Sequence, residues 1–469
     1  MTIKFIIPAR KNIVQSPEQL KNDFNKLLTG NKRSWTTIPP AILMLMALTP
    51  KSINVIVEDE NLDEINFDED VDLVGISAIT ATVNRGYEIA DEYRSRGVKV
   101  IMGGIHVSNL PQEALLHADS IVIGEVETVW RNILKDFKRG RLKQIYQAHH
   151  FLPMDEIPIP RFKLLKKQEY MCAMLETVRG CKYDCSFCTL KNMHGQQPRC
   201  KSVNRIVKEV RKVRWLNIFQ PKPIVFIDKE FASDINRTKA LLKRLVKIRN
   251  LSYNIQTMGN IFKDADMLSM LQESGCSYIL LNYENQNNNS VYMKDNEKLD
   301  HYYDSIEKIQ SKGMIAGVSF TLGYSSDTTD VFGPIADFIK KSKLVSYAIN
   351  TVLPMPGSSL FNKLEKENRL LHKDWYYYDG FHTCFEPDNM SADELENGIR
   401  WLHKEAGDLN RLYDCTIDIL KNWNSLDIIK IISRISLLYM TFSGHFESSF
   451  ISSLSKQANL NSNSTRLQI

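Results

Sequence analysis

Hydrophobic residues in the first third of the chain fall in short runs that amphipathic segments separate. The runs are rich in valine and isoleucine and apolar on both faces, which is typical of buried parallel strands. They lie at residues 4–9, 53–60, 71–80, 98–105 and 120–125. The segment 83–97 has helical spacing and ends at Gly97, a residue type common just after helices. This alternation predicts an α/β domain over residues 1–150, built on a doubly wound parallel sheet of the Rossmann-like kind.

A second alternation of strand-like and helix-like segments begins near residue 170. Its first strand is expected in MLETVRG (174–180). Further strands are expected at 223–231, 251–259, 276–284, 314–324 and 345–354. Strands followed by helices in this way predict a (βα)6 partial TIM-like barrel over residues 165–360, with its chemistry on the loops after the strands. A helical C-terminal extension is expected at 361–455 and a disordered polar tail at 456–469.

Small and polar residues follow the predicted strands of the first sheet, at the carboxyl ends where such sheets bind their ligands. They are Ser77, Thr80, Gly103, Gly104, His106 and Glu125. Paired glycines let a ligand approach the backbone closely. The alternative is that Gly103 and Gly104 only form a tight turn. A single histidine such as His106 is more often structural than a ligand.

Length, composition and charge narrow the class of protein. The chain has 469 residues, enough for two or three domains, and 43% hydrophobic residues, enough for large cores. Its 60 Lys and Arg nearly balance 55 Asp and Glu, so no nucleic-acid partner is expected. No transmembrane segment is expected, because no apolar run is long enough. The N-terminal apolar run is also too short for a secretion signal, so we expect a cytoplasmic protein with reduced thiols.

Three of the eight cysteines crowd into RGCKYDCSFC (179–188), as Cys181, Cys185 and Cys188. Iron–sulfur clusters usually take four thiolates, so three cysteines leave one iron with an open position. An open position is where catalytic metal sites bind a reactant. Zinc is the competing hypothesis, but His194 and Cys200 lie too far along the chain for finger-like spacing. The motif therefore predicts a cluster whose fourth iron is available for chemistry.

The cysteine spacing, with aromatic Phe187 before the last cysteine on the first loop of the predicted barrel, resembles the radical S-adenosylmethionine (radical SAM) superfamily. The resemblance implies a [4Fe-4S] cluster on Cys181, Cys185 and Cys188, with S-adenosylmethionine bound to the open iron. Reduction then yields a 5′-deoxyadenosyl radical that abstracts hydrogen from the substrate. The resemblance also implies contacts to S-adenosylmethionine from Phe187, Asp228, Glu230 and Glu284. The alternative for each carboxylate is a salt bridge at the barrel rim.

The stretch GGIHVSNLPQEALLHADSIVIGEVETVW (103–130) resembles the cobalamin-binding domain fused in front of many radical SAM enzymes. The resemblance implies bound cobalamin. It favours Ser77 and Gly104 as cobalamin contacts. The other strand-end residues, Thr80, Gly103, His106 and Glu125, are predicted to lie at the same site. Many cobalamin proteins bind cobalt through the histidine of an Asp-x-His-x-x-Gly loop, and residues 1–60 contain no such loop. His106 is the first histidine of the chain.

The domain order implies a cobalamin-dependent enzyme that methylates an unactivated carbon of a small-molecule or lipid substrate, with flavodoxin or ferredoxin as electron donor. An oxidative cyclase or rearrangement enzyme without net methyl transfer would share this signature. A non-enzymatic iron–sulfur redox sensor is a third hypothesis, although a simple electron carrier would ligate all four irons. A transfer-RNA methylthiotransferase is disfavoured because residues 1–171 contain no cysteine for its second cluster.

Two features of the later part of the chain complete the prediction. The aromatic residues Trp375–Tyr378 either pack in a core or wall a substrate pocket. Ser391 and Glu394 have capping-box spacing and predict the start of a helix. The remaining cysteines are expected to be buried as small hydrophobic residues. They are Cys172, Cys200, Cys276, Cys384 and Cys415.

Overall fold

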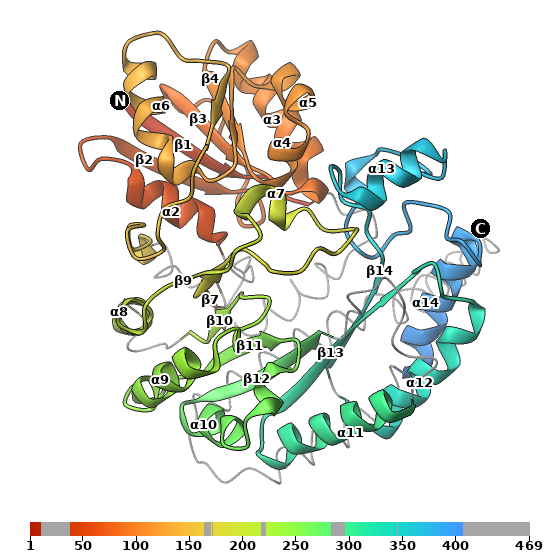
Figure 1. The fold of residues 1–469 in the computed structure, drawn as a ribbon. Coiled ribbons are helices and arrows are strands. Elements are labelled where there is room, and N and C mark those ends of the chain that lie inside the picture. Colours follow the sequence, from red (N-terminus) through yellow and green to blue (C-terminus); the bar gives the residue numbers. More distant parts are fainter. Residues whose placement is uncertain are drawn as a thin grey trace, which may run out of the picture.

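The computed structural model describes two six-stranded sheets, and the segment that carries the cysteine loop, residues 180–189, lies between them (Figure 1). The described residues are 1–10, 38–163, 170, 172–216, 222–282, 296–344 and 346–406. The predicted α/β class and both parallel sheets are confirmed.

The first sheet is parallel throughout and has the strand order β2-β1-β3-β4-β5-β6. Its strands are β1 (Thr2–Ile7), β2 (Asn54–Asp59), β3 (Leu73–Ser77), β4 (Lys99–Gly103), β5 (Ser120–Ile123) and β6 (Ile145–Gln147). The strand order reverses beside β1, which creates the switch point where ligands of such sheets bind.

Helices cover both faces of the first sheet, as the two-sided hydrophobic runs predicted (Figure 1). One layer contains α2 (Pro40–Leu48) and α6 (Trp130–Lys138). The other contains α3 (Val83–Ser95), α4 (Ile105–Asn109) and α5 (Pro111–His117). Phe5 of β1 packs in the first layer with Trp130, whereas Ile6 packs in the second. This alternation buries both faces of β1.

The second sheet is also parallel, and its strands are neighbours in chain order from β7 to β14. They are β7 (Ala173–Leu175), β10 (Ile224–Phe226), β11 (Tyr253–Thr257), β12 (Cys276–Asn282), β13 (Ile315–Leu322) and β14 (Ser346–Thr351). The helices between them are α8 (Val203–Leu216), α9 (Ile235–Leu245), α10 (Met267–Glu273), α11 (Asn296–Ser311) and α12 (Phe332–Lys341). Its curved open form is the predicted partial barrel (Figure 1).

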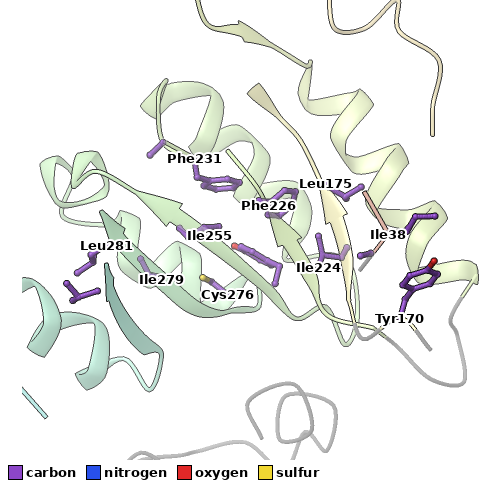
Figure 2. Packing of buried hydrophobic residues seen from close by; sticks show 14 of the residues in the cluster. Ile38, Tyr170, Leu175, Ile224, Phe226, Phe231, Ile255, Cys276, Ile279 and Leu281 are labelled. Atoms are coloured by element: carbon purple, nitrogen blue, oxygen red, sulfur yellow. The ribbon is translucent and has the colours of Figure 1, made fainter. Parts of the chain in front are cut away.

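One face of the second sheet packs against these helices. Phe226, Ile255 and Ile279 are buried there, as Figure 2 shows. The strand residues that alternate with these point to the other side of the sheet and form its concave inner face. Gln256 and Asn282 of this face are partly exposed. Side chains alternate across a strand, so this inner face is separate from the helix-covered core.

The predicted first barrel strand is split in two. β7 ends at Leu175, and the chain then forms the short strand β8 (Val178–Arg179), which pairs antiparallel with β9 (Arg199–Cys200). The cysteine loop and α7 (Leu190–His194) lie between β8 and β9. This inserted hairpin lies between the two sheets (Figure 1).

The chain after β14 contains α13 (Ser359–Lys366), the short helix η6 (Trp375–Tyr377) and α14 (Ala392–Ala406). The capping prediction is confirmed, because the Glu394 backbone N–H donates to Ser391 Oγ at 3.2 Å and the Ser391 N–H donates to the Glu394 carboxylate at 2.8 Å. Residues 407–455 of the expected extension and the tail at 456–469 lie outside the described residues, as does Cys415. Within the described part of the chain, every helix is too short or too polar to cross a membrane.

Candidate active site between the two sheets

The cysteine loop presents three partly exposed thiols, those of Cys181, Cys185 and Cys188. A backbone hydrogen bond from Cys188 to Cys185 closes the second half of the loop at 3.1 Å. Among the described residues, no three side chains of the usual ligand types converge as they do around a metal ion. The donor set nevertheless fits an iron–sulfur cluster, because it consists of three soft thiol ligands on one accessible loop.

Asp228 anchors the strand that leads into this loop. Its buried carboxylate accepts hydrogen bonds from the backbone N–H groups of Thr177 at 2.7 Å and Val178 at 2.9 Å, and from the Thr177 hydroxyl. Burial raises the pKa of Asp228 to about 6, while these hydrogen bonds act in the opposite direction. Both oxygens therefore already have protein donors and fix the break between β7 and β8.

Glu230 connects the ends of two neighbouring strands in a similar way. Its buried carboxylate accepts hydrogen bonds from the Ala232 N–H at 3.0 Å, the Thr257 hydroxyl at 2.8 Å and the Met258 N–H at 2.8 Å. Among the described residues, the partners of Asp228 and Glu230 are backbone amides and hydroxyls, so neither carboxylate forms the rim salt bridge considered as an alternative there. Glu284, the third predicted carboxylate, lies outside the described residues.

Phe187 lies at the back of the cysteine loop, against the last two barrel strands. Its ring makes an edge contact with Tyr324 at a centroid distance of 6.3 Å. The Leu360 N–H donates to the Ser186 carbonyl at 2.8 Å and so fixes this side of the loop. Beside Phe187 is a hollow of about 200 Å³, which Tyr324, Val352 and Leu360 help to line.

A larger cavity of about 250 Å³ lies between the two sheets. The first sheet contributes strand-end residues to its lining: Ser77, Gly103, Gly104, Gly124 and Glu125. The second sheet and the inserted hairpin contribute the opposite wall: Met174, Glu176, Arg179, Met193, His194 and Ile227. Four of the six predicted cobalamin residues therefore line one cavity, which faces the segment that holds the cysteines.

Gly104 shows why this wall requires glycine. Its φ of +118° and ψ of −179° are a conformation that is essentially restricted to glycine. A Cβ atom at this position would lie 2.4 Å from the Ala78 carbonyl oxygen. The turn at Gly104 therefore requires glycine, the same glycine lines the cavity, and its contact with cobalamin stays a prediction. Together with Gly103 and Gly124 it exposes bare backbone, a cradle that fits a large planar cofactor such as cobalamin.

His106 and Thr80 are absent from the lining of this cavity, contrary to their predicted place. His106 is buried in α4, where its Nε2 lies 3.1 Å from the Glu113 carboxylate and its ring packs against Trp375 at 5.0 Å. The short helix after Gly104 directs His106 into the helical layer. Thr80 is likewise buried, in the turn after β3.

Glu113 joins this layer to the later part of the chain. It accepts hydrogen bonds from the Tyr87 hydroxyl at 2.9 Å and from the Trp375 indole N–H at 3.0 Å. Burial opposes ionisation of Glu113, but the hydrogen bonds outweigh it and lower its pKa. Trp375 and Tyr378 are buried in the core of the first sheet. Their predicted packing role is therefore confirmed, and residues 370–378 form a C-terminal strap across that domain.

Sequence reasoning missed an ion cluster centred on Glu125. The side chain of Glu125 is 1% exposed, and its carboxylate lies 3.1 Å from Arg179 Nη1, 3.0 Å from His194 Nδ1 and 3.2 Å from Arg199 Nη1. Burial acts to raise the pKa of Glu125, but the hydrogen bonds from His194 and Arg199 and the charge of Arg179 lower it to about 2. Arg179 also pairs with Glu127 at 2.7 Å and with Glu176 at 2.9 Å.

Family comparisons agree with this two-part arrangement. Residues 41–134 match the model of the B12 binding domain, and residues 175–339 match the radical SAM superfamily. Bacteriochlorophyllide d C-8(2)-methyltransferase of Chlorobaculum tepidum is 29% identical over 74% of this chain and 80% of its own length. Hopanoid C-2 methylase of Rhodopseudomonas palustris is 23% identical over 72% of this chain and 66% of its own length.

Solved structures show the same fold. The radical S-adenosylmethionine methyltransferase TsrM from Kitasatospora setae, with cobalamin and a [4Fe-4S] cluster bound, has a TM-score of 0.58 at 15% identity and covers 78% of each chain. OxsB, with aqua-cobalamin and S-adenosylmethionine bound, has a TM-score of 0.61 at 14% identity, covering 100% of this chain and 81% of its own.

The barrel, its three-cysteine loop and the superfamily match define a radical SAM protein. The sheet ahead of the barrel is a B12 binding domain, so the chain belongs to the cobalamin-binding-domain-containing radical SAM enzymes. These matches bear out the predicted cofactors: a [4Fe-4S] cluster, S-adenosylmethionine and cobalamin. The assignment of individual residues to each cofactor stays a prediction.

Proposed function

We propose that this protein is a cobalamin-dependent radical SAM methyltransferase that acts on an unactivated carbon of a small-molecule or lipid substrate. The observation that carries the proposal is the shared cavity, where the glycine-rich strand ends of the B12 binding domain face the segment that holds the cysteines. The two relatives compared above are, by name, a bacteriochlorophyllide methyltransferase and a hopanoid methylase. Their names support methyl transfer as the outcome.

We assign the residues of the cysteine loop and of the two cavities to the three cofactors by their position. Cys181, Cys185 and Cys188 would hold the cluster, and the hollow beside Phe187 has aromatic and aliphatic side chains suited to the adenine ring of S-adenosylmethionine, with charged residues also in its lining. Ser77 and the cavity glycines would hold cobalamin. When bound, these groups supply a 5′-deoxyadenosyl radical and a transferable methyl group. The protein itself anchors the loop through Asp228 and the rim through Glu230.

The inner face of the barrel supports a substrate whose reacting part is uncharged. Within the described strands of this sheet, the inward-facing side chains are uncharged and include Gln256, Asn282 and Asn350. Tyr278 closes the floor: its hydroxyl lies 3.0 Å from Ser346 Oγ. Amide side chains can donate and accept hydrogen bonds, whereas a charged group placed on these strands would find no opposite charge there.

Tyr278 can cross the floor only because glycine occupies position 317. A Cβ atom on Gly317 would lie 2.0 Å from the Tyr278 hydroxyl oxygen. The side chain of Tyr278 thus extends from β12 across β13 to reach Ser346 on β14. The Tyr278 side chain therefore limits how deeply a substrate can enter the barrel.

The experiment is anaerobic turnover with S-adenosylmethionine that carries a deuterated methyl group. The reductant is flavodoxin or ferredoxin, the electron donors we expect, and the trial substrates are bacteriochlorophyllide d and a hopanoid. Transfer of one labelled methyl group to a carbon of either substrate supports the proposal. Substrate that is consumed to an oxidised product without label, with release of 5′-deoxyadenosine, would instead establish a cyclase or rearrangement enzyme. Failure of the reduced protein to cleave S-adenosylmethionine would favour a redox sensor.

A further inference from the structure

Glu125 holds both ends of the segment that carries the cysteines. Arg179 lies just before Cys181, whereas His194 and Arg199 follow Cys188, and all three contact the one Glu125 carboxylate. Glu125 itself belongs to the B12 binding domain, directly after Gly124 of the cavity wall. A single side chain therefore connects the wall of one predicted cofactor site to both sides of the other.

A second contact from the same domain holds the helix after the loop. Asn109, at the end of α4, accepts a hydrogen bond from the Asn192 side chain of α7 at 2.9 Å. Asn192 also lies 3.2 Å from the Gly357 carbonyl oxygen of the barrel. A Cβ atom on Gly357 would lie 2.6 Å from the Asn109 side-chain oxygen, so this docking is close. Asn109 follows β4 and Glu125 follows β5. The glycines at the ends of these two strands line the cavity.

Burial makes the Glu125 contacts stronger than an ordinary surface salt bridge. The exposed fractions of the Glu125 and Arg179 side chains are 1% and 10%, and those of His194 and Arg199 are 20% and 17%. Breaking a buried ion pair by removing one partner leaves an uncompensated charge, which is strongly unfavourable. The cluster is thus a rigid link between the two domains.

We propose that Glu125 is a positioning residue that fixes the cysteine loop relative to the cavity wall of the B12 binding domain. The proposal rests on the proposed function in one respect: a methyl group can pass from one cofactor site to a radical made at the other only if their spacing is set. Glu125 sets that spacing from outside the ligand set, because it contributes no thiol and its carboxylate is occupied by the loop's own cations.

The contacts of the cluster predict which part of the cysteine-bearing segment responds when Glu125 loses its charge. Without the Glu125 charge, Arg179 keeps Glu127 and Glu176. His194 and Arg199 pair with no other carboxylate within the part of the chain that the structure describes. The segment after Cys188 should therefore loosen more than the strand before Cys181.

The test is hydrogen exchange followed by mass spectrometry on the full-length, cofactor-free protein. In Glu125→Gln, backbone amides of residues 189–200 should exchange about tenfold faster than in the wild type, with a smaller change at 178–180. Two matched controls are Glu127→Gln, which leaves Arg179 two carboxylates, and Glu113→Gln, which disturbs the contact to Trp375 on the other layer. Neither variant should accelerate hydrogen exchange at the backbone amides of residues 189–200.

Glu125→Asp supplies the conservative comparison, because it keeps the charge and shortens its reach. It should give a smaller acceleration of the same amides, and it serves as the test if Glu125→Gln does not fold. Unchanged exchange at 189–200 in the folded variant, or equal acceleration in Glu113→Gln, would overturn the positioning role. This readout requires no cofactor or substrate, so it is independent of the proposed function.

The loaded enzyme supplies the second readout. Glu125→Gln should retain iron and bind cobalamin more weakly, and when saturated with cobalamin it should release about tenfold more 5′-deoxyadenosine per methyl group transferred than the wild type. An unchanged ratio would show that the link does not set the productive spacing. If the wild type transfers no methyl group to any substrate, the proposed function fails, while the exchange experiment still decides the role of Glu125.

Discussion

Substitution of Gly104 by alanine tests whether the cavity wall depends on the backbone shape described above. The φ and ψ of Gly104 belong to a region that costs other residues about 1–3 kcal/mol. The added Cβ would also lie 2.4 Å from the Ala78 carbonyl oxygen, a backbone atom that cannot rotate away. Overpacking of this kind costs a further 1–3 kcal/mol or so. We therefore expect Gly104→Ala to reduce the free energy of unfolding by about 2–6 kcal/mol.

Gly140→Ala is the matched control, because Gly140 lies in the same domain and has a φ of +64° but no atom within 4 Å of an added Cβ. It carries the backbone cost without the clash, about 1–2 kcal/mol. The comparison between the two variants therefore separates the ordinary cost of a positive φ from the added cost of the Gly104 conformation and its contact with Ala78.

The assay is thermal unfolding of the full chain, combined with measurement of cobalamin retained per chain. A difference of about 2–3 kcal/mol between the variants corresponds to a difference in Tm of roughly 5 °C or more for a domain of this size. Gly104→Ala should also lose cobalamin, because its strand end shifts, whereas Gly140→Ala should retain it. Equal Tm values and equal cobalamin contents in the two variants would refute the reasoning.

Three further predictions concern other parts of the molecule. Cys185→Ala should lose its iron while retaining the circular dichroism of the wild type, whereas Cys200→Ala, on β9, should keep its iron; an iron-replete Cys185→Ala would exclude this residue as a cluster ligand. The lowered pKa of Glu125 contributes stability that is present above pH 4.5 and is lost as the pH falls towards 2. Relative to Glu125→Gln, the wild type should lose about 3 kcal/mol over this interval in urea titrations, and parallel curves would contradict the assignment. Trp375→Ala should reduce the free energy of unfolding by about 3–5 kcal/mol, since the ring is buried and donates to Glu113; a change below 1 kcal/mol or so would mean that the strap is not part of the core.

The sequence predicted most of the two sheets because their strands are buried on both faces or alternate in burial. The run at 53–60 became β2 (Asn54–Asp59), and the run at 314–324 became β13 (Ile315–Leu322). The split of MLETVRG into β7 and β8 was not predictable, since it depends on hydrogen bonds to Asp228 from a strand that is distant in sequence. Hydrophobic periodicity contains no information about such a partner.

The candidate site was predicted less completely than the fold. The cysteine motif and the strand-end glycines are local patterns, so they could be found from spacing alone. The Glu125 cluster could not be found in this way, because Arg179, His194 and Arg199 reach Glu125 only when the two sheets dock. The prediction that His106 lies at the cavity was wrong for a related reason. A strand-end position does not fix the direction of a side chain on the following short helix.

The cavity between the sheets makes cofactor binding and domain docking linked equilibria. A ligand that contacts both walls stabilises the docked arrangement by mass action, by about 2.7 kcal/mol at a hundredfold excess over its Kd. Because the two equilibria are linked, a change that loosens the docking lowers the affinity for that ligand in proportion to the loss of the docked population. We therefore expect residues of the C-terminal strap, such as Trp375, to influence the affinity for cobalamin although they lie outside the cavity.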